Sequence, residues 1–448
     1  MIQHLQHCDQ MIRFLHKVAK PFTSARQPQI HLPKHLKPER VNLTLKSYLK
    51  SDPIKTILLF SDLLRKKVSS VDSYSLLYVI KACAKKSLAT EGKQAHTLVI
   101  KLGYEPIIFV QTSLIDMYAA TSNVADVHKM FDEIPNKNVV CWTSLISAYV
   151  KNEKPYRALD IFRQMQIFNV EPDQVTLTVA LSACADLGAL DKGVWIHDLI
   201  YRKPEFSEDL SLMNALLNMY VKCGDIRKAK LLFDNIRIKD VRSWTSMIVG
   251  HALHGQGEEA LRLFSALEEK NKSRSRKGHG TEDQILVPND VMFIGVLMAC
   301  SHAGMVEEGK RYFRTMIEEY GIKPRPFHFG CMVDLLCRRG LLKEAYSFIL
   351  AMPIQPNAVI WRTLLGASGV HGNEELGAVA RSKLRELDAS LVGDDVTLSN
   401  IYAAKGMWEE KVMLRDEITQ RRTPGCSSIE VKKLFSSMLV ERSDYPLD

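Results

Sequence analysis

Residues 139–173 read VVCWTSLISAYVKNEKPYRALDIFRQMQIFNVEPD. Apolar side chains recur at helical spacing over residues 145–149 and again over residues 158–165, which predicts two short amphipathic helices. Residues 151–154 interrupt the pattern between them, and Pro172 ends it because the residue before a proline disfavours helix. The two helices form an antiparallel pair. Such a pair cannot bury both apolar faces alone, so it must pack against similar neighbours.

The sequence contains those neighbours as repeats. The tripeptide at Trp142 recurs at Trp244, 102 residues later, and the dipeptides at Phe131 and Met117 recur at the same interval. This interval is too long for one helical hairpin, so it predicts a triplet of unlike repeats. Small residues keep the same register at the eleventh and twentieth places of the middle repeats: Cys83, Cys184 and Cys300, and Gly92, Gly193 and Gly309.

Nine repeats follow from this register. They span residues 38–72, 73–107, 108–138, 139–173, 174–209, 210–240, 241–289, 290–325 and 326–357. Repeats of this length predict an all-α solenoid, in which neighbours share one core and one face is left for a partner. Repeat 241–289 is longer than its counterparts because of a polar, basic insert at 270–284, which we expect to form a flexible loop between repeats.

The two ends of the chain differ from the repeats. Residues 1–37 are basic, with Asp9 as the only acid, and apolar side chains such as Phe14 interleave with the basic ones. This composition predicts an organellar transit peptide, and the low serine content favours a mitochondrial over a chloroplast address; a disordered basic arm is the alternative. Paired helices with altered detail are expected over 358–391 and from 392 to about 425.

The composition limits the classes of partner and chemistry. The chain has 60 Lys and Arg against 51 Asp and Glu, a net charge of +9, which is compatible with a polyanionic partner without identifying one. No run of about 18 apolar residues could span a bilayer, so no membrane partner is expected. The nine cysteines include no CxxC, and three share one place on an apolar helix face, so we expect packing rather than disulfides or metal.

The sequence lacks two catalytic motifs that its residues partly resemble, the zinc motif of a nucleobase deaminase and the phosphate-binding loop of an NTPase. A nucleobase deaminase needs HxE and CxxC to hold zinc and its proton shuttle, and none of the 14 histidines begins HxE. Gly304–Arg311 is close to a phosphate-binding loop but lacks the final Ser or Thr that would meet Mg²⁺. We therefore expect no enzymatic activity and no cofactor or metal.

Short motifs characterise the repeats and the C-terminal part. They are Ser144–Tyr149, Ala299–Gly304 and Met332–Leu336 in the repeats, and His371–Asn373, Leu398–Ala403 and Pro424–Ser427 near the C-terminus. These motifs resemble the plant pentatricopeptide-repeat (PPR) family, in the class with alternating P, L and S repeats. The last three resemble the family's E extension, here 358–431, with a short tail at 432–448 and, we expect, no DYW deaminase domain. The resemblance covers 38–431 and implies a right-handed α-solenoid superhelix of helix-turn-helix PPR repeats.

The same resemblance implies a function. Members of this class bind organellar transcripts and specify cytidines for conversion to uridine. We accordingly expect a site-recognition factor that binds single-stranded RNA and recruits a DYW-type deaminase, or another editing factor, in trans through 358–431. Two alternatives stay open, an organellar RNA splicing or stability factor and a helical-repeat scaffold for protein interactions.

The resemblance also implies which residues read the RNA. Each repeat would meet one base, read by the fifth residue and the last residue of that repeat. The pairs are Asn42 with Asp72, Thr112 with Asn138, Thr143 with Asp173, Thr178 with Asp209, Asn214 with Asp240, and Thr245 with Asn289. In the family's code Asn/Asp favours U, Thr/Asn favours A and Thr/Asp favours G, so the implied order is U, gap, A, G, gap, U, A.

Some repeats predict no base or a less certain one, and the paired residues also have a possible structural role. Leu77 with Ile107, and Ile294 with Arg325, lack the polar pair, whereas the gap at Thr178 with Asp209 has it and could prefer G. Gly330 with Asn357 predicts no particular base. The aspartates could instead simply cap the next helix, and the two roles are compatible.

Overall fold

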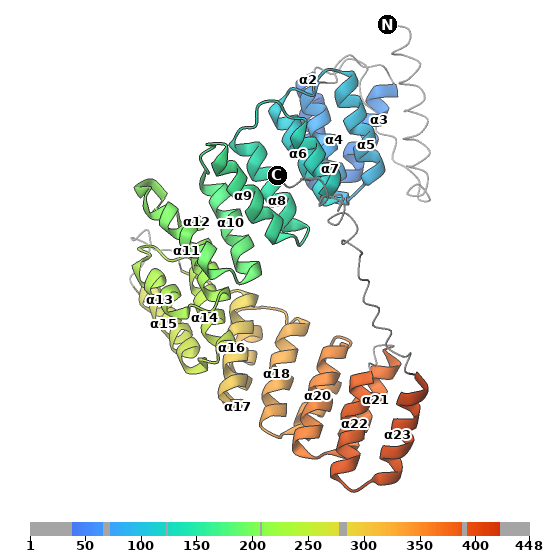
Figure 1. Ribbon diagram of the computed structural model, residues 1–448. Coiled ribbons are helices and arrows are strands. Elements are labelled where there is room, and N and C mark those ends of the chain that lie inside the picture. Colours follow the sequence, from blue (N-terminus) through green and yellow to red (C-terminus); the bar gives the residue numbers. More distant parts are fainter. Residues whose placement is uncertain are drawn as a thin grey trace, which may run out of the picture. The chain divides into compact units, whose positions relative to one another are not determined.

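The structure is a computed structural model that describes residues 38–65, 72–121, 124–206, 208–276, 285–387 and 392–421 (Figure 1). The regular elements in these ranges are all helices. The predicted transit peptide, the motif at Pro424 and the tail at 432–448 lie outside the described residues. The described helices include none that is both long and apolar enough to cross a membrane.

The chain divides into two compact units, residues 1–303 and 304–448. The first contains α2 (Pro38–Ser51), α3 (Pro53–Arg65), α4 (Ser73–Lys86), α5 (Ala89–Lys101), α6 (Ile108–Ala120), α7 (Val124–Asp132), α8 (Val139–Lys151), α9 (Pro155–Ile167), α10 (Gln174–Leu187), α11 (Leu190–Tyr201), the short 3-10 helix η2 (Pro204–Phe206), α12 (Leu210–Lys222), α13 (Ile226–Asn235), α14 (Val241–Leu253), α15 (Gly257–Arg276) and α16 (Asp290–Ala303). The second contains α17 (Val306–Glu318), α18 (Pro326–Arg338), α19 (Leu342–Leu350), α20 (Ala358–His371), α21 (Glu374–Glu386), α22 (Val392–Ala404) and α23 (Trp408–Arg421).

The helices pack as a series of antiparallel hairpins. In the first compact unit the first helices of successive repeats contact one another from α2 through α4, α6, α8, α10, α12 and α14 to α16. Each second helix packs against its own first helix and against the first helix of the next repeat, as α9 does between α8 and α10. The second compact unit repeats this arrangement with α18, α20 and α22 as first helices. The predicted all-α solenoid is confirmed.

Aromatic contacts explain the 102-residue interval. Trp142 on α8 is buried and packs edge to face on Phe131 of the preceding helix, with ring centroids 4.8 Å apart. Trp244 and Phe233 make the same contact at 5.1 Å. The two recurring motifs are therefore the two sides of one contact between repeats.

The recurring glycines and methionines form a second contact of this kind. A Cβ atom added at Gly92 would lie 2.2 Å from Sδ of Met117, and one added at Gly193 would lie 2.3 Å from Sδ of Met219. Only a residue without a side chain lets the second helix of one repeat approach the first helix of the next this closely. Buried cysteines such as Cys83 and Cys184 fill the same core, and burial raises the pKa of each of these two thiols to about 12.

The expected flexible loop at 270–284 is wrong for its first half. Helix α15 continues to Arg276, so residues 270–276 are helical; residues 277–284 lie outside the described part. The stretch contains two Lys and two Arg, which have high helix propensity, and the helix before it is anchored by buried Phe264 and Leu267. Asn271 then fixes the returning chain, because Nδ2 donates to Leu286 O (2.8 Å) and Oδ1 accepts from Leu286 N (3.0 Å).

Gly193→Val should destabilise the protein, by about 1–3 kcal/mol, because the added methyl groups overfill a close contact. Gly366→Val is the matched control, since a Cβ atom added at this helical glycine on α20 would have nothing within 4 Å. Thermal unfolding followed by circular dichroism compares the two. Equal midpoints for the two variants would contradict the role assigned to the glycine–methionine contact.

Candidate nucleic-acid interface

The last residue of most repeats caps the first helix of the next. Asp72 accepts from Ser75 N (2.8 Å), and Asp240 accepts from Ser243 N (2.9 Å). The other caps are Asn138 on Cys141 N (3.1 Å), Asp173 on Thr176 N (2.8 Å), Asp209 on Leu212 N (2.7 Å), Asn289 on Met292 N (2.9 Å) and Asn357 on Ile360 N (3.1 Å). A side-chain oxygen here satisfies one of the amide groups that a helix start leaves unpaired. The capping role considered from the sequence for the aspartates is confirmed for Asp72, Asp173, Asp209 and Asp240. The three asparagines make the same contact.

The fifth residue of each repeat lies one turn into the first helix. The threonines donate to their own helix, as Thr143 does to Val139 O (2.8 Å) and Thr245 to Val241 O (2.7 Å). Thr178 and Thr112 do the same, to Gln174 O (2.8 Å) and Phe109 O (3.3 Å). Asn214 and Thr245 are only 8% and 9% exposed, so most of their surface is already covered by the protein.

Two predicted pairs are joined directly. Asn42 Nδ2 donates to Asp72 Oδ2 (2.9 Å), although 30 residues separate them in the sequence. Asn214 Nδ2 donates to Asp240 Oδ1 (3.0 Å) in the same way. The fifth residue of one repeat and the cap of the next first helix therefore meet at the junction of two repeats.

A serine hydroxyl in the next repeat also contacts the asparagine of each of these two pairs. Ser75 Oγ donates to Asn42 Oδ1 (2.8 Å), and Ser243 Oγ donates to Asn214 Oδ1 (2.7 Å). Each serine is the third residue of its repeat. Sequence reasoning missed both, because a Ser three residues after an Asp indicates at most a helix start and does not show the contact with the preceding repeat.

The pair Thr143 and Asp173 is joined through an intermediate. Thr143 Oγ1 lies 2.5 Å from Thr176 Oγ1, and Thr176 Oγ1 donates to Asp173 Oδ1 (2.7 Å). Thr176 is again the third residue of its repeat. At this junction a threonine takes the place that serine has in the two asparagine groups.

Three predicted pairs are not joined. Among the described contacts no hydrogen bond links Thr112 to Asn138, Thr178 to Asp209, or Thr245 to Asn289. The third residues at these junctions are Cys141, Leu212 and Met292, none of which carries a hydroxyl group. In the second compact unit Asn357 is exposed, and a Cβ added at Gly330 would meet open space.

The environment of Asp240 favours its charged form. Partial burial raises the pKa of this carboxyl group, but hydrogen bonds from Ser243, Asn214 and Arg242 outweigh it, and the net result is a lowered pKa. Arg242 Nε lies 3.2 Å from Oδ2. The carboxylate is therefore held as an acceptor at neutral pH.

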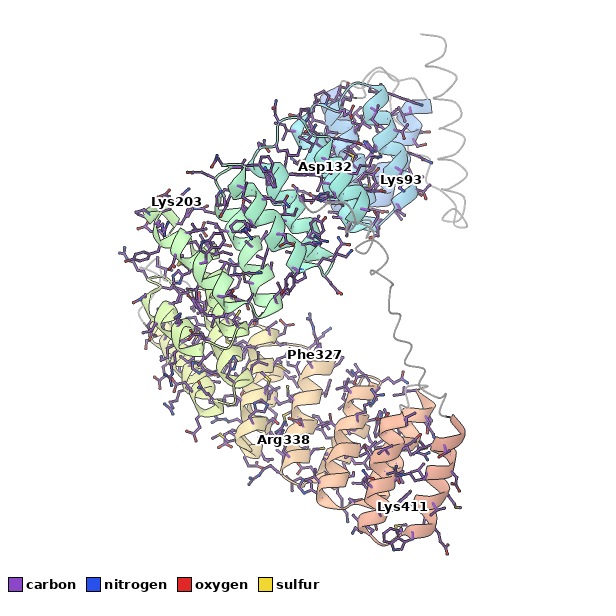
Figure 2. All side chains as sticks on the ribbon, viewed as in Figure 1. Lys93, Asp132, Lys203, Phe327, Arg338 and Lys411 are labelled. Carbon is purple, nitrogen blue, oxygen red and sulfur yellow. The ribbon has the colours of Figure 1, made fainter. Side chains whose placement is uncertain are left out.

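Apolar side chains stand beside the polar groups. The second residue of several repeats is large, apolar and exposed, three places before the fifth: Tyr74 (52%), Val140 (46%), Val175 (60%) and Val291 (46%) in the first compact unit, and Phe327 (74%; Figure 2) and Val359 (65%) in the second. At one junction the exposed Tyr74 and the partly buried Phe109, the second residue of the next repeat, fill the space between repeats, since their rings stack with centroids 5.1 Å apart and planes at 19°. The fifth residue there is the buried Leu77.

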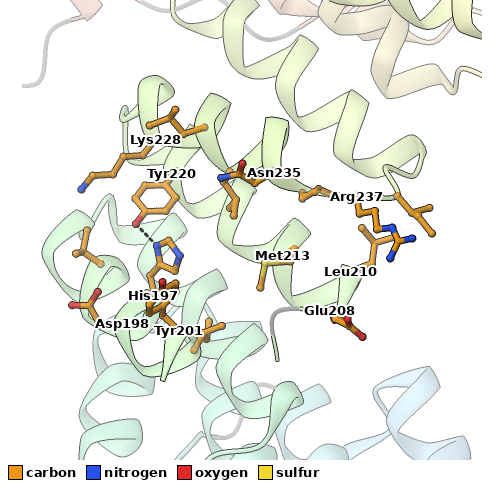
Figure 3. A pocket seen from close by; sticks show the side chains of 16 residues that line it. His197, Asp198, Tyr201, Glu208, Leu210, Met213, Tyr220, Lys228, Asn235 and Arg237 are labelled. Carbon is orange, nitrogen blue, oxygen red and sulfur yellow. Dashed lines mark hydrogen bonds between the residues drawn. The ribbon is translucent and has the colours of Figure 1, made fainter. Parts of the chain in front are cut away.

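A large cavity lies elsewhere, among α11, α12 and α13. Its volume is about 980 Å³, and the hydrogen bond between His197 Nδ1 and Tyr220 Oη (2.7 Å) lies in its wall (Figure 3). None of the paired residues lines it. No cluster of three or more His, Cys, Asp or Glu side chains suited to a metal ion occurs among the described residues.

Family models match much of the chain. The PPR repeat family matches residues 137–186, and the PPR repeat matches 211–241, 242–271, 291–320 and 327–353. The E motif matches residues 371–430.

Curated relatives and solved structures agree with these matches. Pentatricopeptide repeat-containing protein At1g59720, chloroplastic/mitochondrial, of Arabidopsis thaliana is 35% identical, covering 88% of this chain and 61% of that protein. Pentatricopeptide repeat-containing protein At5g56310, also of Arabidopsis thaliana, is 37% identical, covering 81% of this chain and 72% of that protein. The chain spans about three fifths of the length of the first relatives it matches. The crystal structure of the pentatricopeptide repeat protein PPR10 in complex with an 18-nt psaJ RNA element has a TM-score of 0.70 at 14% identity, covering 88% of this chain and 56% of PPR10; this likeness concerns the fold alone.

Asp240→Asn should remove a contribution to stability that depends on pH. Asparagine still caps a helix, so the variant isolates the charge. Because the folded-state pKa of Asp240 is lowered, its stabilisation is present at neutral pH and is lost as the pH falls through that lowered pKa. The free energy of unfolding of the variant in urea should lie below that of the parent at pH 7, by about 1 kcal/mol, and the two should converge towards pH 3.

Asp234→Asn is the control, because this carboxylate is more than half exposed and pairs with Lys230 on the same helix at 3.6 Å. It should lower the free energy of unfolding at pH 7 by less than Asp240→Asn does. A difference between Asp240→Asn and the parent that stays constant down to pH 3 would contradict the assignment.

Proposed function

This chain belongs to the pentatricopeptide-repeat family, and we propose that it is a sequence-specific, single-stranded RNA-binding protein that selects a site for C-to-U editing in an organellar transcript. The observation that carries the proposal is the series of polar pairs at the junctions of successive first helices. Each pair carries hydrogen-bonding groups. At several junctions an exposed apolar side chain lies three places before the fifth residue. The solved RNA complex of PPR10 supports RNA as the ligand class.

The proposed mode of binding uses both kinds of side chain. Helical repeats of this size can meet one base each, with two or three side chains reading its Watson–Crick edge. Apolar and aromatic side chains offer surfaces on which bases pack without regard to sequence. The exposed second residues, such as Val140 and Val175 on either side of the Thr143 site, are placed for this second task.

The implied order of bases is U, gap, A, G, gap, U, A. The two U positions correspond to Asn42 with Asp72 and Asn214 with Asp240, the pairs that are joined directly. The G position corresponds to Thr143 with Asp173, joined through Thr176. Where a site leaves the wrong base with an unpaired polar group, discrimination exceeds that given by shape alone.

The first gap has a physical basis. Its repeat, 73–107, carries Leu77 in place of a polar residue, and Ile107 precedes α6 without a side-chain cap. The stacked rings of Tyr74 and Phe109 occupy the junction where a base would otherwise enter. We expect the nucleotide opposite this repeat to be passed over without being read.

The E extension, residues 358–431, is proposed to engage the deaminase. Its fifth residue is Arg362, whose Nε pairs with both oxygens of Asp394 (3.1 and 3.2 Å), so an ion pair stands where the repeats carry a base-reading group. A second pair joins Arg381 to Asp395, which is 4% exposed. These 448 residues contain no HxE and no CxxC motif, so the zinc chemistry would come from outside them. We propose a DYW-type deaminase acting in trans.

We propose an organellar address, which the names of the relatives and the N-terminal composition support. Relatives are named as chloroplastic or as chloroplastic/mitochondrial. The basic residues 1–37, with a single acid, are compatible with either organelle, and their low serine content favours the mitochondrion.

Thr143→Asn, with Asp173 kept, should change the preferred base at the fourth position of U-x-A-G-x-U-A from G to U. We expect the parent to bind the G-containing RNA at least about fivefold more tightly than the U-containing one, and the variant to reverse this. Dissociation constants of the full chain for the two RNAs, at several salt concentrations, measure the change. Thr97→Asn on the second helix α5 is the control and should leave the preference unaltered.

The outcome that would contradict base reading is equal binding of both RNAs by the parent. If that binding also fell steeply with salt, only a basic surface would remain. No binding to either RNA would favour a protein-interaction scaffold instead.

Loss of the protein from a plant line should abolish one C-to-U conversion. The affected cytidine should lie beside a sequence matching U-x-A-G-x-U-A, and sequencing of organellar transcripts would detect it. Reintroduced parent chain should restore the conversion, whereas Thr143→Asn should not. Intact editing together with a lost intron excision or an unstable transcript would contradict the editing role and favour splicing or stability.

A further inference from the structure

We propose that the hydroxyl side chains of Ser75, Thr176 and Ser243 are positioning residues for base recognition, holding the fifth residue of the preceding repeat in one orientation. This inference rests on the proposed function and extends it to residues outside the paired positions. All three side chains are 0% exposed, so they act through another residue and not by touching RNA.

The two asparagine groups show how the orientation is set. A carboxylate accepts hydrogen bonds and cannot donate them, so Nδ2 of Asn214 must face Asp240. Oδ1 of Asn214 then faces Ser243, whose hydroxyl donates to it at 2.7 Å. The amide is thereby held at both ends, and the group at Asn42 is held in the same way by Asp72 and Ser75.

A fixed amide matters because of the two pyrimidines it must distinguish. Uracil and cytosine have nearly the same shape, but uracil presents an acceptor at the position where cytosine presents an amino donor. An amide free to turn over could pair with either base, since it carries a donor on one side and an acceptor on the other. When the amide is held in one orientation, its remaining N–H and its remaining oxygen lone pair have fixed positions toward the RNA. Those positions match the donor and acceptor pattern of only one of the two bases.

The serine is itself held in place. Ser243 Oγ accepts from Asp240 N (3.3 Å) and lies 2.9 Å from Asp240 Oδ1, which closes a capping box at the start of α14. Its single proton is therefore shared between the carboxylate and Asn214, and the whole group is anchored to the helix start. Asp240 decides which way the amide faces, and Ser243 restricts how far the amide moves.

At the Thr143 site the third residue of the next repeat, Thr176, contacts a hydroxyl group and not an amide. The hydroxyl of Thr143 has one proton and two acceptors within reach, Val139 O and Thr176 Oγ1. Thr176 connects this hydroxyl to the Asp173 carboxylate, which favours one direction of donation along the chain of groups. Junctions with Cys141, Leu212 or Met292 at the third place lack this connection and should discriminate less sharply.

The test compares RNAs that differ by one base, U or C, at the position of Asn214 or at the position of Asn42. The full chain, Ser243→Ala, Ser75→Ala and Ser243→Thr are each titrated with these RNAs. We expect Ser243→Ala to lower the ratio of C to U dissociation constants by about three- to tenfold, the range for one lost hydrogen bond, and only at the Asn214 position. Ser75→Ala should act only at the Asn42 position, and Ser243→Thr should keep the parent ratio, as Thr176 shows that threonine fits this place.

The ratio is measured on one preparation, so a loss of folded protein cancels from it. Ser113→Ala is the matched control, because this buried hydroxyl on a first helix donates to its own backbone, at Phe109 O; it should leave both ratios unchanged. A parent that discriminates U from C while Ser243→Ala and Ser75→Ala keep the full ratio would overturn the inference and leave the proposed function standing. A parent with no U-over-C preference at either position would overturn both.

Discussion

The hydrogen bond from a cap residue to the start of the next first helix is the interaction on which the rest of the structure depends. Every helix start leaves backbone amide groups unpaired, and a solenoid of short hairpins has many such starts. Asp72, Asp173 and Asp240 each satisfy one of these amides. Because the cap lies between consecutive first helices, the requirement of folding alone places a polar side chain beside the fifth residue of the preceding repeat.

Capping and recognition therefore share one side chain. In Asp72, Oδ1 accepts from the helix start while Oδ2 accepts from Asn42. In Asp240, Oδ1 serves both the helix and Asn214, and Oδ2 accepts from Arg242. A carboxylate has enough lone pairs for both tasks. Both direct contacts between paired residues join an aspartate cap to an asparagine at the fifth place of the preceding repeat.

Much of the fold could be predicted from the sequence because the contacts between repeats recur with the repeats. Phe131 with Trp142, and Gly92 with Met117, can be recognised because each contact reappears one triplet later. The helical insert at 270–276 occurs once and so had no second copy to indicate its structure. The hydroxyls of Ser75 and Ser243, and the stack of Tyr74 on Phe109, depend on three-dimensional contacts between repeats that spacing along the chain does not reveal.

The most direct measurement of the central claim is a selection of RNAs from a random pool by the full chain. The account predicts enrichment of U-x-A-G-x-U-A, with no base preferred at the position opposite repeat 73–107. Enrichment of a sequence unrelated to this string, or of none at salt concentrations that suppress nonspecific binding, would contradict the claim that the pairs at the repeat junctions read bases.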